Sequence, residues 1–302
     1  MGLYLGGMTT ETRNPRTMQL DQMSPLEIVT VMNEEDARVP LAIAKCLPQI
    51  AQAVTWAAES FEKGGRLFYM GAGTSGRLGV LDAAECPPTF GVPKEMVVGL
   101  IAGGEKAFIE AVEGAEDSRE LAVEDLKAHG LTANDLVVGI AASGRTPYVL
   151  GGLDYAKSVG CHTAAIACNI GSAIGKAAEL AIEVNCGPEV LTGSTRLKSG
   201  TAQKLILNMI STGSMVRTGK AYQNLMVDVQ QTNEKLHTRA ENIVIDATGV
   251  EREKARAAID AAGGSVKTAI TMLLADCDAK EAARRLERAR GHVREAIWLE
   301  VL

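Results

Sequence analysis

The segment Arg66-Leu-Phe-Tyr-Met-Gly-Ala-Gly-Thr-Ser-Gly76 joins a short apolar run to a loop of small residues, and a helical pattern follows it. An apolar strand followed by a loop and a helix is typical of a parallel sheet covered on both faces. The same order recurs four more times, with apolar runs at residues 96–101, 136–140, 163–167 and 180–184. We therefore predict an α/β fold with five parallel strands, whose carboxyl ends carry the ligand-binding loops.

Helical segments flank this predicted sheet in the sequence. Ser24 followed by Pro25, with Glu27 three positions after the serine, predicts the start of a helix. A second helix is expected over residues 39–62, and no strand is expected after residue 242. The predicted division is an arm with N-terminal helices (1–55), a sheet domain (56–240) and a helical subdomain (241–302). Within that subdomain we expect helices at 251–262, 265–274 and 279–290.

Composition excludes several classes of protein. A chain of 302 residues with 46% hydrophobic content can bury a large core. The net charge of −6 argues against nucleic acid as a partner. No two of the six cysteines form a C-x-x-C pair and the four histidines are scattered, so we expect no metal site. The first residues do not resemble a signal peptide, and no apolar run reaches the ~18 residues of a membrane span, which predicts a cytoplasmic protein with buried, reduced thiols.

The glycine-rich loop at residues 71–76 formally matches the dinucleotide motif G-x-G-x-x-G. That motif requires an acidic residue ~20 positions further on, at the end of the second strand. Here the second apolar run ends at Ile101, and Glu105 lies well beyond that spacing. A Walker A loop is also disfavoured, because no Gly-Lys-Ser/Thr follows. The sequence thus predicts no nucleotide and no other cofactor.

Three loops combine hydroxyl side chains with a predicted helix N-terminus, where free amides and the helix dipole favour an anion. They are residues 71–76, residues 143–146 and residues 192–196, the last before a helix expected near Gly200. One such serine or threonine is ordinarily a helix cap, but three at one sheet edge favour a shared small phosphate. The predicted binding residues are Gly73, Thr74, Ser75, Ser143, Arg145, Thr146 and Thr195.

Two glutamates have unusual settings. Glu85 precedes Cys86 and a double proline, which we expect to end the helix that follows the first loop. Glu116 follows the loop of the second strand. Each has a plain alternative: Glu85 as a carboxylate at a helix end, and Glu116 as an acid favoured by a helix N-terminus.

Five segments of the chain form a specific set of motifs. They are Gly71-Ala-Gly-Thr-Ser-Gly-Arg-Leu-Gly79, Asp82-Ala-Ala-Glu-Cys-Pro-Pro-Thr89, Glu113-Gly-Ala-Glu-Asp-Ser118, Ala142-Ser-Gly-Arg-Thr-Pro147 and Asn233-Glu-Lys-Leu236. Together they resemble the N-acetylmuramic acid 6-phosphate etherase family of the sugar isomerase (SIS) superfamily, and the resemblance runs from about Thr10 to the C-terminus. It implies a flavodoxin-like sheet and a homodimer that removes D-lactate from its substrate in cell-wall recycling, leaving N-acetylglucosamine 6-phosphate. It also implies that Glu85 is the proton donor and Glu116 a second active-site residue. The C-terminal helices resemble a ubiquitin-associated bundle.

Two other functions fit the same fold. One is a sugar-phosphate-binding regulatory protein similar to glucokinase regulatory protein, which lacks the glutamate that stands here as Glu85. The other is an aldose–ketose phosphate isomerase, which also needs a carboxylate base. Lys235 and His237 are further candidates, reaching the site of a neighbouring subunit.

Overall fold

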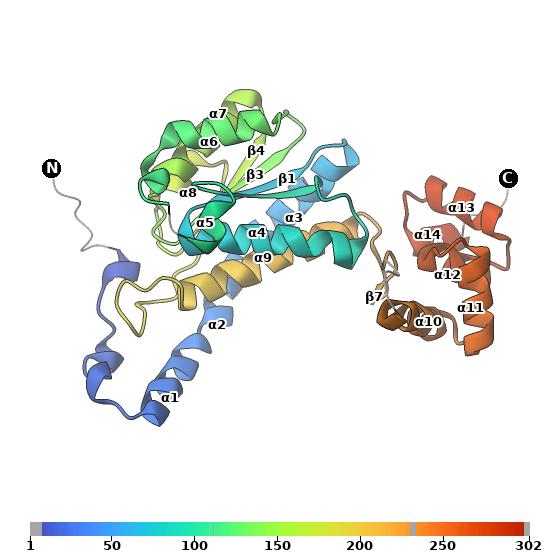
Figure 1. The fold of residues 1–302 in the computed structure, drawn as a ribbon, viewed down its shortest axis with the longest axis horizontal. Helices are drawn as coiled ribbons and strands as arrows, with labels where there is room; N and C mark the ends of the chain where they lie inside the picture. Colours follow the sequence, from blue (N-terminus) through green and yellow to red (C-terminus); the bar gives the residue numbers. More distant parts are fainter. Residues whose placement is uncertain (1–7, 111, 230–233, 299–302) are drawn as a thin grey trace. The chain divides into compact units, whose positions relative to one another are not determined.

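The computed structural model describes residues 8–110, 112–229 and 234–298 (Figure 1). Contacts divide the chain into two compact units. The first contains Met1–Ala84 and Glu95–Ser211, and the second contains Glu85–Lys94 and Thr212–Leu302. The division into three parts predicted from the sequence stays a prediction. Asn233, the first residue of the last family motif, lies outside the described residues.

A five-stranded parallel sheet in the order β2-β1-β3-β4-β5 forms the centre of the first unit. All residues of β1 and β3 are buried, as expected of strands covered on both faces. Gly71 at the end of β1 pairs with Ile101 of β2 and Ile140 of β3, so these three strands end at one level. The strand order turns between β1 and β3, where doubly wound sheets bind ligands. The strands are β1 Leu67–Gly71, β2 Val97–Ile101, β3 Leu136–Ala141, β4 His162–Ala167 and β5 Leu180–Glu183, which confirms the five predicted runs.

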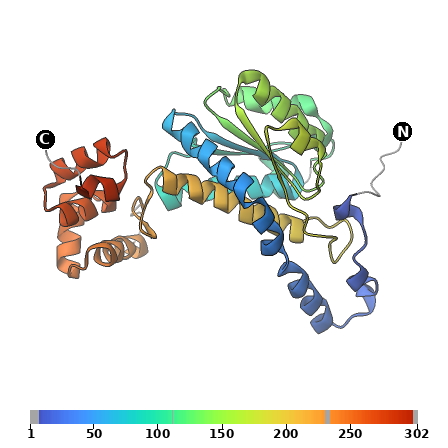
Figure 2. The same ribbon diagram turned by 180° about the vertical axis from the view of Figure 1, so that it is seen from behind.

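Helices cover both faces of this sheet. Phe68 and Met70 point from β1 into a core shared with α6 and α7. Tyr69 points to the opposite face, where its hydroxyl donates to the Leu207 carbonyl of α9 (3.4 Å). Helices α3, α4 and α9 lie on that second face (Figures 1 and 2). The helices are α3 Leu47–Glu62, α4 Gly73–Phe90, α5 Lys106–Ile109, α6 Arg119–Ala128, α7 Pro147–Val159, α8 Ala173–Ala177 and α9 Lys198–Arg217, with the short turn η5 Ala115–Asp117.

The double proline does not end α4, so the expected helix end was wrong. The helix continues through Pro87 and Pro88 to Phe90, and Glu85 lies inside it. Each proline removes one N–H donor from the last turn, but the φ of proline fits a helix and little helix follows that would be lost. The Gly91 N–H then closes the end by donating to the Pro87 carbonyl (2.9 Å).

The N-terminal region begins with an arm, residues 9–22, that contains three short turns. The helix start predicted at Ser24 is confirmed, because Ser24 and Glu27 form a reciprocal capping box. The single helix expected over 39–62 is wrong: a tight turn interrupts it, and Pro48 starts a new helix in the first turn, where no donor is missed. The elements are η1 Thr9–Glu11, η2 Pro15–Thr17, η3 Leu20–Gln22, α1 Pro25–Asp36, α2 Val39–Ile43 and η4 Ala44–Cys46.

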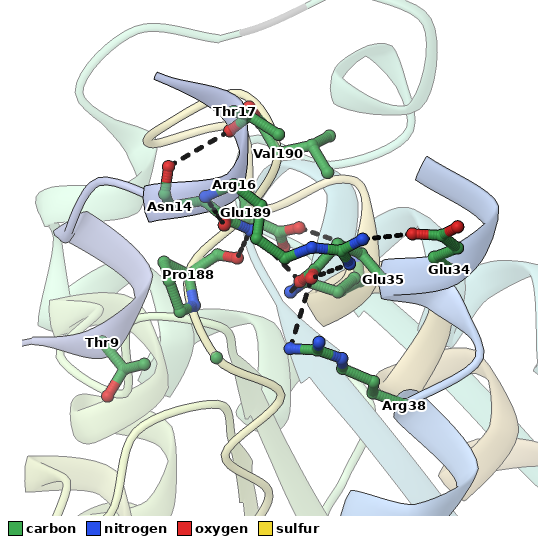
Figure 3. A network of polar contacts seen from close by, with 12 residues as sticks. Thr9, Asn14, Arg16, Thr17, Glu34, Glu35, Arg38, Pro188, Glu189 and Val190 are labelled. Carbon is green, nitrogen blue, oxygen red and sulfur yellow. Dashed lines mark hydrogen bonds and ion pairs between the residues drawn. The ribbon is translucent and has the colours of Figure 1, made fainter. Parts of the chain in front are cut away.

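Polar contacts of Glu35 hold the arm to α1 (Figure 3), and a buried ion pair joins Glu35 to the start of α9. Lys198 Nζ lies 2.5 Å from Glu35 Oε2, and both side chains are at most 2% exposed. Arg16 and Asn14 of the arm also bond the Glu35 carboxylate, at 2.9 and 3.1 Å. Thr17 donates to the Val190 carbonyl (2.8 Å). Burial raises the pKa of Glu35, but hydrogen bonds from Lys198 and Arg16 outweigh that effect and leave the pKa below its ordinary value.

The second unit is mostly helical. Ala240, Ala255, Ala269 and Ile270 are fully buried in its core. The three helices predicted from the sequence are confirmed, whereas a two-strand hairpin and the last helix were not predicted, because such short elements show no periodicity. The elements are β6 Ala221–Tyr222, β7 Leu225–Met226, α10 Glu234–Thr248, α11 Arg252–Ala261, α12 Val266–Ala275, α13 Ala279–Arg288 and α14 Val293–Trp298. In the described part of the chain, no helix has the length and apolar character that a membrane crossing requires.

The six cysteines are free thiols, and all except Cys277 are buried. Burial raises the pKa of Cys161 to about 12 and that of Cys186 to about 12. It also raises the pKa of Cys168. These thiols therefore stay protonated and act as small apolar side chains.

Candidate functional site

The loops after β1 and β3 flank the point where the strand order turns. In the first loop, Gly73 starts α4 with φ of +53°, a conformation that favours glycine. Ser75 lies in the first turn of α4 and is buried. Its hydroxyl donates to Oε1 of Gln203 on α9 (3.0 Å), and Gln203 is fully buried. Ser75 thus stands at a helix N-terminus at the sheet edge, in the position predicted for an anion ligand.

The loop before α9 approaches the same place. A Cβ atom built on Gly200 would lie 3.6 Å from Cγ2 of Thr74 and 3.7 Å from the Thr195 carbonyl oxygen, so Gly200 brings these two threonines near each other. The helix, however, begins at Lys198, earlier than expected, and its amides are not free for an anion. The N–H groups of Lys198 and Ser199 donate to the buried Glu189 carboxylate (3.0 and 2.9 Å). These two amides therefore do not contribute to an anion site, and the Thr195 side chain stays a predicted contact.

The loop after β3 connects the hydroxyls to a carboxylate. Thr146 is at the N-cap position of α7, yet its side chain caps no amide. Instead its hydroxyl donates to Oε1 of Glu116 (3.1 Å). Glu116 lies in η5, two residues before Ser118, which caps α6. The helix-cap alternative for Thr146 therefore fails. Glu116 still lies just before the N-terminus of α6, where an acidic side chain is also favoured, so that alternative stays open.

A pocket of about 500 Å³ opens beside the same loop. Arg145 and Lys176 bring two cationic side chains to it, which suits an anionic ligand. Asn169 links its walls, because Asn169 Nδ2 donates to the Ser143 carbonyl (3.2 Å) and to Oγ1 of Thr10 in the arm (3.0 Å). Lining residues include Met8, Thr9, Ser143, Arg145, Asn169, Ser172 and Lys176.

Glu85 is exposed on α4, ten residues after Ser75. At 1.5 Å per residue this corresponds to an axial rise of ~15 Å along the helix. Arg77, which follows the first loop, is no phosphate ligand, since its guanidinium donates to the carbonyls of Ala107 and Phe108 (2.8 and 2.7 Å). Among the residues with described positions, no group of three or more His, Cys, Asp or Glu side chains could hold a metal ion.

One turn before Glu85, Asp82 ties α4 to α9. Burial raises the pKa of Asp82, against the opposing effect of hydrogen bonds from Asn208 (2.7 Å) and Ser211 (3.1 Å). Gln203 and Asn169 lie outside the quoted motifs, and Asp82 lies in one of them without a predicted role. The partners of these buried polar residues are distant in the sequence, so their contacts could not be predicted.

Comparison with known proteins identifies the family. Residues 49–157 match the model of the glucokinase regulatory protein N-terminal SIS domain, and residues 120–212 match the SIS domain model. An N-acetylmuramic acid 6-phosphate etherase of Exiguobacterium sp. is 63% identical over 97% of this chain and 100% of its own length. One of Serratia proteamaculans is 61% identical over 98% of this chain and 99% of its own.

A solved structure supports the fold. It is a putative phosphosugar isomerase involved in capsule formation from Bacteroides fragilis, which is 22% identical and superposes with a TM-score of 0.51 over 67% of this chain and 95% of its own. The five-stranded parallel sheet is thus that of a SIS domain. By its identity to full-length relatives, the chain belongs to the N-acetylmuramic acid 6-phosphate etherase family.

Proposed function

We propose that the protein cleaves the D-lactyl ether of N-acetylmuramic acid 6-phosphate to give N-acetylglucosamine 6-phosphate and D-lactate. The observation that supports this most directly is the hydrogen bond from Thr146 to Glu116, because it joins a carboxylate to a loop that we propose binds the phosphate. The names of the full-length relatives support the same substrate. The reaction belongs to amino-sugar catabolism and peptidoglycan recycling, and we propose the cytoplasm as its compartment.

The phosphate contacts in this proposal come from the three loops. Ser75, Ser143 and Thr195 donate hydroxyl hydrogen bonds, with Thr74 and Thr146 close by. The amides at the α4 N-terminus and the helix dipole add favourable electrostatics. Gly73 and Arg145 are the remaining binding residues. Because Ser143 also lines the 500 Å³ pocket, a phosphate there leaves room beside it for the sugar.

The ether is cleaved by elimination and rehydration in this proposal. An unactivated ether has a strongly basic alkoxide leaving group, but ring opening exposes a C1 aldehyde that acidifies the C2 proton. Glu116 removes that proton, and Glu85 protonates the lactyl oxygen as its bond to C3 breaks. Water then adds at C3 of the unsaturated aldehyde, and a proton returns to C2. Each positioned proton transfer contributes typically ~10²–10⁴-fold.

The active protein is a homodimer in this proposal. Leu26 (74% exposed) and Leu41 (71% exposed) on the N-terminal helices offer apolar surface for the second copy.

One experiment separates this function from its alternatives. The protein is assayed side by side on N-acetylmuramic acid 6-phosphate and fructose 6-phosphate. Release of D-lactate from the first, with no conversion of the second, is expected. Binding without turnover would favour a regulatory protein, and conversion of fructose 6-phosphate would favour an isomerase.

Isotopes test the mechanism. In D₂O enriched with ¹⁸O, deuterium should appear at C2 and ¹⁸O at C3 of the sugar. If ¹⁸O appeared in the lactate hydroxyl instead, the lactyl carbon was attacked and elimination is wrong.

A further inference from the structure

We propose that Gln203 is a positioning residue that sets the direction of the Ser75 hydroxyl proton, and that its side-chain amide turns over when an anion binds. This rests on the proposed role of Ser75 as a phosphate contact. The proposal adds Gln203, a buried residue of α9 that supports Ser75 and does not contact the substrate itself.

The contact between Ser75 and Gln203 is closed to solvent. Ser75 Oγ lies 3.0 Å from Gln203 Oε1, Ser75 is 7% exposed and Gln203 is 0% exposed. With this amide orientation the serine donates and the glutamine accepts. Nε2 of Gln203 is buried and has no hydrogen-bond partner in the part of the chain that the structure describes. A buried amide donor without a partner is uncommon in folded proteins.

The hydrogen bond from Ser75 to Oε1 and the unpartnered Nε2 of the same amide are complementary. A serine hydroxyl has one proton and two acceptor sites, so a proton donated to Gln203 leaves only lone pairs for a phosphate. A half-turn of the amide places Nε2 where Oε1 was. Nε2 then donates to Ser75 Oγ, and the serine proton is free for a phosphate oxygen. After this turn, Oε1 of Gln203 has lost its hydrogen-bond partner. The charge-assisted hydrogen bond from the Ser75 hydroxyl to the phosphate offsets that loss.

Only a side chain that can both accept and donate permits this exchange. An ionised glutamate at position 203 accepts only, and would hold the serine proton away from the anion. A methionine of similar shape neither accepts nor donates, and leaves the proton free. The relay therefore predicts that Gln203→Glu weakens binding more than Gln203→Met, although methionine removes more polar character.

The test is a double-mutant cycle with Ser75→Ala, measured by calorimetry with N-acetylglucosamine 6-phosphate and by steady-state kinetics. Gln203→Glu should weaken binding about 10- to 100-fold, the range for one hydrogen bond to a charged group. KM should rise accordingly, while kcat changes less than about 3-fold. In the Ser75→Ala background the same substitution should weaken binding less than about 3-fold, because the hydroxyl it acts through is absent.

Gln49→Glu is the matched control. Gln49 is a half-buried glutamine of α3, also with a buried Oε1 that lacks a partner among the described residues. This substitution adds the same charge on a different helix and should leave binding unchanged. Equal losses for Gln203→Glu with and without Ser75 would overturn the relay, since charge alone would then explain them. If Ser75→Ala itself has no effect, the proposed phosphate site fails instead.

A second measurement needs no Gln203 variant. In ¹⁵N-labelled protein, the Gln203 side-chain NH₂ signals should move downfield when N-acetylglucosamine 6-phosphate is added, because one proton gains a hydrogen bond. They should not move in Ser75→Ala at a ligand concentration that saturates it. Unmoved signals in the saturated wild-type protein would overturn the amide turn even if the variants fail to fold.

Discussion

The Glu35→Gln substitution tests how strongly the polar contacts of Glu35 hold the arm (Figure 3). The change keeps the shape of the side chain but removes its charge. Lys198 Nζ, 1% exposed, then faces a neutral amide in place of the carboxylate 2.5 Å away. A buried ammonium without a counter-ion is strongly unfavourable, so the folded state should lose stability.

The expected magnitude follows from the burial of the pair. Breaking a buried ion pair costs about 3–5 kcal/mol, and we take ~3 because the new amide can still accept one hydrogen bond. For a unit of roughly 200 residues, each kcal/mol lowers Tm by about 2–4 °C. Glu35→Gln should therefore lower Tm by about 6–12 °C.

Calorimetry at pH 7 measures this shift. Glu34→Gln is the matched control, because Glu34 pairs with Arg16 at the surface, where ion pairs contribute little. Replacing both members of the buried pair by apolar residues, Glu35→Leu with Lys198→Met, should cost less than Glu35→Gln alone. The reasoning would be refuted if Glu35→Gln had the same Tm as the Glu34→Gln control. It would also be refuted if the double variant were less stable than Glu35→Gln.

The pH dependence has a definite sign. The Glu35 pKa is lowered in the folded protein, so its stabilising effect is complete above the unfolded value of about 4.3. This stabilising effect is lost as the pH falls through the lower pKa of the folded protein. The Tm difference between wild type and Glu35→Gln should thus be largest at pH 7 and should disappear in acid.

The same substitution should also affect the kinetics. Because the N-terminal region supplies Met8 and Thr9 to the pocket, the Glu35→Gln protein should show a larger rise in KM than fall in kcat.

Further outcomes test the site, the oligomeric state and the expected independence from metal. Ser75→Ala and Ser143→Ala should each weaken substrate binding by about 1–3 kcal/mol, and unchanged affinity in both would contradict the phosphate loops. Thr146→Val should lower kcat about tenfold, because Glu116 loses its donor; a wild-type kcat would exclude that role. Glu85→Gln should keep substrate affinity but lose about 10²–10⁴-fold in kcat, so weakened binding with normal turnover would argue against an acid. Light scattering should show a dimer at micromolar concentration, and a chelator should not reduce turnover; a monomer, or activity restored by zinc or magnesium, would contradict these two expectations.

The sheet could be predicted from sequence because its signals are local. The run that forms β3, for example, is apolar throughout and stands between polar loops, so no distant residue is needed to recognise it. The end of α4 shows the limit of a local rule: Pro87 and Pro88 disfavour a helix, but their position in its last turn decides the outcome.

The partners within the site depend on packing between distant segments. Ser75 bonds a residue 128 positions away, and the hydroxyl of Thr146 bonds a residue 30 positions before it rather than a helix amide. Which helix covers which face of the sheet determines both contacts. Neither contact produces a periodic pattern or a motif in the sequence. Glu116 could therefore be singled out by resemblance, while the hydrogen bond that Thr146 donates to it could not be predicted.

The buried thiols make it possible to measure the unfolding of the first unit by cysteine labelling. Thiolate is the form that reacts, and a thiol with a pKa of about 12, such as that of Cys161 or Cys186, holds almost none at neutral pH. A fluorescent maleimide should therefore modify only the half-exposed Cys277 of the folded protein. Labelling of Cys46, Cys161, Cys168 and Cys186 must wait until the first unit opens. The delay between the two phases then measures how often that unit unfolds, with no substitution in the chain.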